Sequence, residues 1–268
     1  MRLFDTHVHL DAGPNVLAPG ELVERAAAVG VTDLLLVGVE PDNWARCAAL
    51  AHAMPSVHLG LGIHPQAVRD LDDATIDDAL ERLPALLRQT GAVAVGEIGL
   101  DHLWDKDPIQ RQRQRDVLIR QLDIAVALDL PVSLHALRSL EPLLALWRAH
   151  PARRRLPAIL HSFSGSAEQV PMFAAEGMCF AFSGSVTWTG ARHTPNAARV
   201  VPDELLLLET DAPYQPPHPL EPGPCRPDHL AQVLQRVAEL RGASPEHIAE
   251  LTWANARRTL RLDGPPKP

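Results

Sequence analysis

Residues 4–10 of the chain read FDTHVHL, an apolar and β-branched segment that carries one acid and two histidines. Side chains alternate between the two faces of a strand, so Asp5, His7 and His9 are expected to share one face. A row of buried polar groups is costly unless something compensates for it, and binding of a metal ion is one such compensation. The segment therefore predicts a strand whose polar face takes part in a site.

Seven further segments are short and apolar, and helical patterns separate them. The eight expected strands are residues 2–8, 33–39, 57–63, 93–99, 131–135, 157–163, 178–184 and 204–211. Between them, stretches such as residues 21–30, 42–53, 75–90 and 108–130 carry apolar residues at helical spacing. Eight strands that alternate with helices favour an α/β fold, a TIM (β/α)8 barrel. An open doubly wound sheet is the alternative, although the glycine fingerprints that bind phosphate in such sheets are missing.

Length and composition suit one large domain. A chain of 268 residues matches a single barrel, so residues 1–268 are expected to form one domain. Hydrophobic residues make up 46% and charged residues 22%, values typical of globular proteins that bury a core. The proline-rich residues 213–227 are expected to form a stiff loop, and residues 244–260 a closing helix.

Targeting signals, cysteines and net charge restrict the cellular location and the binding partners that can be expected. No basic and then apolar leader precedes the first strand, and no apolar run approaches a membrane span, so we expect a cytoplasmic protein without membrane contact. Cys47, Cys179 and Cys225 lie outside any CxxC pattern, which argues against a disulfide framework and a thiolate zinc site. The net charge of −8 opposes broad nucleic-acid binding, so a bound polyanion needs a local feature. No obligate protein partner is expected.

Potential metal ligands recur at the carboxyl ends of the expected strands, where TIM barrels carry their active sites. The expected ligands are His7, His9, Glu97, His135, His161 and Asp211. Imidazole and carboxylate ligands without thiolate suit Zn²⁺, Mn²⁺, Mg²⁺, Ni²⁺ or Fe²⁺. Six ligands exceed what one catalytic ion needs, so two divalent metal ions are expected. Neither lysine lies at a strand end, and Glu97 is therefore the candidate for the group that bridges them.

Six segments together resemble the motifs of one family. FDTHVHL, GIHP, GEIGLD, LPVSLHA, HSFSGS and LLLETDAPY occur in this order over almost the whole chain and resemble the TatD family of metal-dependent hydrolases, many of which are deoxyribonucleases. The resemblance implies a TIM barrel of the amidohydrolase superfamily with a two-ion site. It implies one ion held by His7, His9, Asp211 and Glu97, and another held by Glu97, His135 and His161.

Four more residues are expected near the site. His64 stands where the family has the same residue, so we expect a substrate or phosphate contact, with a structural hydrogen bond as the alternative. His102 follows GLD, where the family often has an aromatic residue, and is expected to contact substrate or metal. Asp5 is expected to support His7 or His9, and Glu209 to support a ligand or hold a third ion.

These expectations describe a hydrolase. A water bound to the ions would attack a phosphodiester bond in DNA, with Asp211 and Glu97 as catalytic residues and Asp211 accepting the proton of the water. The same ligands permit hydrolysis of an amide, ester or lactone in a small molecule. A third hypothesis is a metal-storage protein or scaffold without activity. The sequence leaves open the resident metal, the choice of DNA or RNA, the direction of cleavage and the number of subunits.

Overall fold

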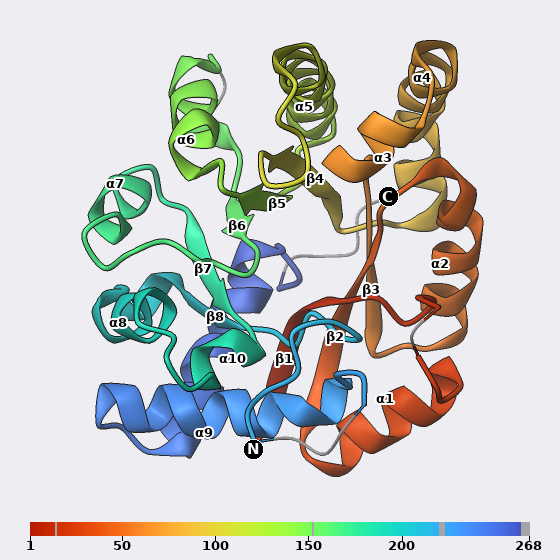
Figure 1. The fold of residues 1–268 in the computed structure, drawn as a ribbon. Coiled ribbons are helices and arrows are strands. Elements are labelled where there is room, and N and C mark those ends of the chain that lie inside the picture. The colour runs from red at the N-terminus through yellow and green to blue at the C-terminus, as the bar shows by residue number, and fades with distance from the viewer. Residues whose placement is uncertain (14, 152, 220–222, 264–268) are drawn as a thin grey trace.

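The computed structural model describes residues 1–263 except 14, 152 and 220–222. Residues 264–268 of the expected domain and 220–222 of the proline-rich loop thus lie outside the described residues. Figure 1 shows a ring of strands at the centre with helices around it.

Eight parallel strands form one sheet in chain order. They are β1 (Leu3–Val8), β2 (Val31–Gly38), β3 (Val57–Leu61), β4 (Ala94–Asp101), β5 (Val132–Leu137), β6 (Ala158–Leu160), β7 (Cys179–Phe182) and β8 (Leu206–Leu208). Val8 bridges to Ala212, just beyond β8, and the His9 amide donates to the Ala212 carbonyl at 2.8 Å. The first strand thereby meets the end of the last. The expected TIM barrel is confirmed, and the open doubly wound sheet is wrong.

Helices cover the outer face of the sheet (Figure 1). They are α1 (Pro19–Ala28), α2 (Pro41–Ala53), α3 (Pro65–Asp70), α4 (Asp73–Thr90), α5 (Pro108–Leu128), α6 (Leu140–Ala149), α7 (Val170–Ala174), α8 (His193–Val200), α9 (Leu230–Arg241) and α10 (Pro245–Thr259). Local chemistry sets their ends. For example, the carboxylate of Asp72 accepts the Thr75 amide at the start of α4, and Gly91 ends that helix with a left-handed φ of 66°.

Two clusters of buried apolar side chains hold the barrel together. One lies between the sheet and the helices and includes Leu34 and Leu36 of β2. The other fills the barrel interior with residues such as Phe4, Leu35 and Leu207, and α10 closes it with Ala256 and Leu260. The interior is therefore a packed core.

Within the described part of the chain, no helix has the length and apolarity that a membrane crossing requires. The three cysteines are free and buried. The expected cytoplasmic location stays a prediction.

Candidate metal centre

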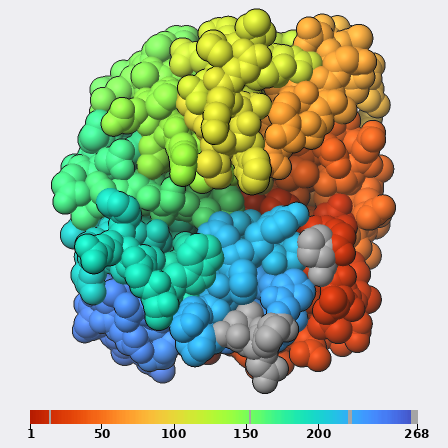
Figure 2. All heavy atoms as spheres, in the orientation of Figure 1, coloured from red at the N-terminus to blue at the C-terminus, as the bar shows by residue number. Residues whose placement is uncertain are grey.

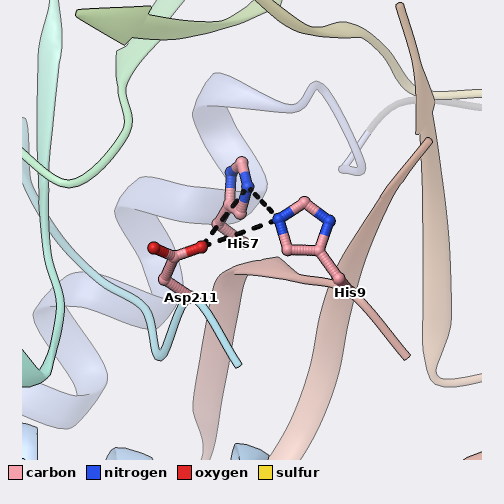
Figure 3. Close-up of side chains that lie close together, drawn as sticks. All are labelled: His7, His9 and Asp211. Atoms are coloured by element: carbon pink, nitrogen blue, oxygen red, sulfur yellow. Dashed lines mark hydrogen bonds and ion pairs between the residues drawn. The ribbon is translucent and has the colours of Figure 1, made fainter. Parts of the chain in front are cut away.

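His7, His9 and Asp211 point toward one another at the carboxyl end of the barrel (Figure 3). The Nε2 atoms of His7 and His9 lie 3.2 Å apart. Asp211 Oδ1 lies 3.6 Å from His9 Nε2 and 4.0 Å from His7 Nε2. All three ligand atoms thus lie within 4.8 Å of one another. An ion with bonds of about 2.0–2.2 Å to nitrogen and oxygen fits between atoms at this spacing.

Glu97 lies at the centre of the wider cluster. Its Oε2 lies 3.3 Å from His7 Nε2, and its Oε1 lies 2.9 Å from His135 Nδ1 and 3.7 Å from His161 Nε2. The structure therefore brings all six expected ligands together. Glu97, His135 and His161 were expected to hold a second ion, and Glu97 contacts both histidines. Glu97 also belongs to two groups of three possible metal ligands, one with His7 and His161 and one with His64 and His135.

A close approach of two strands places Glu97 beside His135. Gly99 of β4 pairs with His135 of β5, and Gly99 has a φ of 152°. A Cβ atom on Gly99 would lie 2.1 Å from the His135 carbonyl oxygen, so a side chain is excluded there. The second glycine of GEIGLD is thus a requirement of the site geometry.

Simple alternation along β1 is wrong at Asp5. The β1–β2 pairing shifts register between Asp5 and Val8, which is typical of a bulge. Asp5 pairs with Leu34, whose side chain belongs to the outer cluster, whereas the His7 ring faces the interior groups at the mouth. Asp5 instead accepts the Thr210 amide at 2.9 Å and the Thr210 hydroxyl at 2.6 Å. Asp5 Oδ1 also accepts the His7 amide at 3.3 Å, so Asp5 supports the backbone of His7, not its ring, together with the segment that carries Asp211.

Two carboxylates lie behind the histidine ligands. Glu209 Oε1 lies 2.8 Å from His161 Nδ1, so the His161 Nε2 atom is directed toward Glu97 and Asp211. Asp101 Oδ2 lies 3.5 Å from His135 Nε2, on the side of the ring opposite Glu97. Carboxylates in this position orient metal-binding histidines. Sequence reasoning assigned no role to Asp101, although it is the last letter of GEIGLD.

His64 and His102 differ in their relation to the cluster. His64 Nδ1 accepts the Gln66 amide at 3.1 Å at the start of α3, so in the neutral ring Nε2 carries the proton. That Nε2 lies 3.4 Å from Glu97 Oε1. His64 is thus built as a hydrogen-bond donor at the site. His102 is half-buried, and within the described residues no hydrogen bond or ion pair joins its ring to the cluster.

Gln215 is a site residue that sequence reasoning missed. Its Nε2 donates to Asp211 Oδ2 and to Ser162 Oγ, both at 2.6 Å, and its Oε1 accepts from Ser183 Oγ at 2.8 Å. Gln215 has a φ of 48°, and a Cβ atom on Gly184 would lie 2.0 Å from the Gln215 carbonyl oxygen. The amide thus fixes one oxygen of Asp211 and leaves Oδ1 facing the histidines.

The surroundings of the cluster shift the pKa values of several of its groups toward the protonation states that bind a metal ion. Burial opposes ionisation of Glu97 and Asp211, but the surrounding histidines outweigh it and lower the pKa of both carboxyls, that of Glu97 strongly. Burial lowers the pKa of His7 and His161. Anionic carboxylates and neutral imidazoles are the forms that bind a metal ion. His9 and His135 differ, because carboxylates overcome the effect of burial. Asp211 and Glu97 raise the pKa of His9, and Asp101 and Glu97 raise that of His135 to about 9.

A TIM barrel with histidines and carboxylates gathered at its carboxyl-end mouth defines the class of metal-dependent hydrolases. The sequence model of one such family, TatD related DNase, matches residues 4–261, and the chain belongs to this family.

The similarity to known proteins extends over nearly the full length of this chain and of its relatives. The metal-dependent hydrolase YabD of Bacillus subtilis is 31% identical over 97% of this chain and 100% of its own. The 3′-5′ ssDNA/RNA exonuclease TatD of Citrobacter rodentium is 33% identical over 97% and 98%. The TatD homologue YjjV from Escherichia coli is 36% identical in sequence, and its crystal structure superimposes on this chain with a TM-score of 0.84 over 97% of each chain.

The expected TatD-type metal-dependent hydrolase is thus confirmed, and it is favoured over a small-molecule amidohydrolase. The cluster offers groups that could bind metal, in keeping with the metal-dependent relatives.

Proposed function

We propose that the protein shortens single-stranded DNA or RNA from the 3′ end by hydrolysing phosphodiester bonds, with two divalent ions. The observation that carries this proposal is the position of Glu97, which lies within 3.7 Å of nitrogen atoms from His7, His64, His135 and His161. A carboxylate so surrounded is suited to bridge two ions. The named exonuclease relatives supply the substrate and the direction.

In this proposal the ions are held by His7, His9, Glu97, His135, His161 and Asp211. When bound, such ions lower the pKa of a water molecule and stabilise charge that develops on the phosphate. Asp211 would accept a proton from that water, and the Gln215 amide holds its Oδ2. The Nε2–H group of His64 would donate a hydrogen bond to a phosphate oxygen. Glu209 holds the ring of His161, and Asp101 that of His135, in the orientation that metal binding requires.

The test is the digestion of 5′-labelled single-stranded DNA and RNA with Mg²⁺, Mn²⁺, Zn²⁺ or Ni²⁺. We expect products that shorten from the 3′ end, no products with a chelator, and no activity in Glu97→Gln. Glu81→Gln, on the exposed face of α4, is the matched control and should retain activity.

Metal binding is followed separately by thermal unfolding. Each active ion should raise the Tm of the wild type and not that of Glu97→Gln. A strand left intact with every ion, while a small ester is cleaved, would overturn the nuclease proposal. A Tm that no ion changes would overturn the metal centre.

A further inference from the structure

In the part of the chain that the structure describes, exposed aromatic side chains occur at one end of the barrel only. Among the described residues, Trp104, Trp188 and Tyr214 are the exposed aromatic side chains, with 62%, 43% and 49% of their surface accessible. Every phenylalanine is buried, as are Trp44 and Trp147, and Trp253 is half-buried. Each exposed ring follows the carboxyl end of a strand, namely β4, β7 or β8. They therefore share the end of the barrel that carries the cluster.

Side-chain and backbone contacts connect each of these residues to the site. The Tyr214 ring centroid lies 5.7 Å from that of His9, edge to face. Trp188 Nε1 donates to the Pro216 carbonyl at 2.8 Å, two residues beyond Tyr214. The Trp104 amide donates to Asp101 Oδ1 at 3.2 Å, and Asp101 in turn contacts His135. The three residues thus belong to loops that surround the cluster.

The mouth of the barrel is hollowed. Figure 2 views this end, and a hollow opens at its centre with the red N-terminal segment on its floor. The yellow segment that follows β4 and the light-blue segment that follows β8 border the hollow on opposite sides (Figure 2). A nucleic-acid strand that reaches the cluster has to pass between these two segments.

The chemistry of the rim favours unpaired bases. With a net charge of −8, the surface does not attract a polyanion, so affinity has to come from contacts other than phosphate neutralisation. Aromatic rings stack on every base, and each stacked base contributes about 1–3 kcal/mol. Paired bases in a duplex hide their faces from such rings.

We propose that Trp104, Trp188 and Tyr214 form a stacking rim that holds the unpaired bases next to the bond being cleaved. The inference rests on the proposed function and specifies how the substrate is held. Because aromatic rings stack on every base, such a rim would let an acidic protein hold single-stranded nucleic acid.

The test compares oligothymidylate with a strand of equal length whose residues near the 3′ end are abasic, so that charge is kept and bases are lost. For the wild type we expect the abasic strand to have a KM about 5- to 150-fold higher, the range that corresponds to 1–3 kcal/mol, with little change in kcat. Replacement of Trp104, Trp188 or Tyr214 by Ala should raise the KM for oligothymidylate and reduce the difference between the two strands. Trp188→Phe should retain most of the effect.

Ile119→Ala, which removes an exposed apolar side chain from the middle of α5, is the control and should change neither KM. Equal KM values for the two strands in the wild type would overturn the stacking rim while leaving the nuclease proposal intact. If neither strand is cleaved, the proposed function itself fails. The comparison of substrates on the wild type does not depend on how any variant folds.

Discussion

Replacement of Asp5 by Ala should destabilise the protein strongly, whereas replacement by Asn should not. The Asp5 carboxylate is fully buried and accepts the amide and the hydroxyl of Thr210. Without it, three buried donors lose this acceptor, since Asp5 Oδ1 also accepts the His7 amide at 3.3 Å. At about 1–3 kcal/mol for each of the two shorter bonds from Thr210, we expect a loss of about 2–6 kcal/mol. In a chain of this size that loss lowers the Tm by on the order of 10 °C.

Asparagine keeps the shape and hydrogen-bonding reach of aspartate at this position. Its carbonyl can accept the Thr210 amide, and its NH₂ group can donate to the Thr210 hydroxyl. Burial raises the pKa of Asp5 to about 7, so a side chain without charge suits the site. We therefore expect Asp5→Asn to stay within about 1 kcal/mol of the wild type, the worth of one ordinary hydrogen bond.

The assay is chemical unfolding followed by circular dichroism, with a parallel titration of divalent metal. Because Thr210 lies between Glu209 and Asp211, Asp5→Ala should also weaken metal binding, by about 10- to 100-fold if it acts like other groups that orient ligands. The reasoning is refuted if Asp5→Ala unfolds at the wild-type denaturant concentration. It is also refuted if Asp5→Asn loses as much stability as Asp5→Ala.

Two further predictions concern the loop after β8 and the cysteines. Gln215→Met keeps the length of the side chain but removes the amide that holds Asp211, so it should lower metal affinity at least about 10-fold, as measured by calorimetric titration; unchanged affinity would contradict this role. Burial raises the pKa of all three thiols, Cys47, Cys179 and Cys225. The folded protein should therefore resist a disulfide reagent at mildly alkaline pH, and the unfolded protein should react at all three; fast labelling of the native protein would show that a thiol is accessible.

The sequence predicted the barrel because its signals are local. Each strand is a short apolar run between helical patterns, and each of the eight expected strands overlaps an observed one. The six expected ligands meet for the same reason, since parallel strands bring their carboxyl ends to one side. The observed β8 is short, Leu206–Leu208, yet Glu209 and Asp211 still reach the cluster.

The remaining features depend on backbone turns that no local pattern encodes. Asp5 leaves the face of His7 because β1 carries a register shift, which alternation cannot foresee. Gln215 reaches Asp211 because both residues adopt positive φ values, 48° and 57°. His102 lies one residue beyond the end of β4, and its amide donates to the Leu137 carbonyl while its ring makes no contact with the cluster among the described residues.

Closure of the barrel has a consequence for biosynthesis. His7 of β1 and His9, which follows that strand, are synthesised about two hundred residues before Asp211 and before Ala212, which bridges to Val8. A nascent or prematurely terminated chain that stops before β8 has only part of the ligand set. The cluster is therefore complete only after the segment that follows β8 has been synthesised.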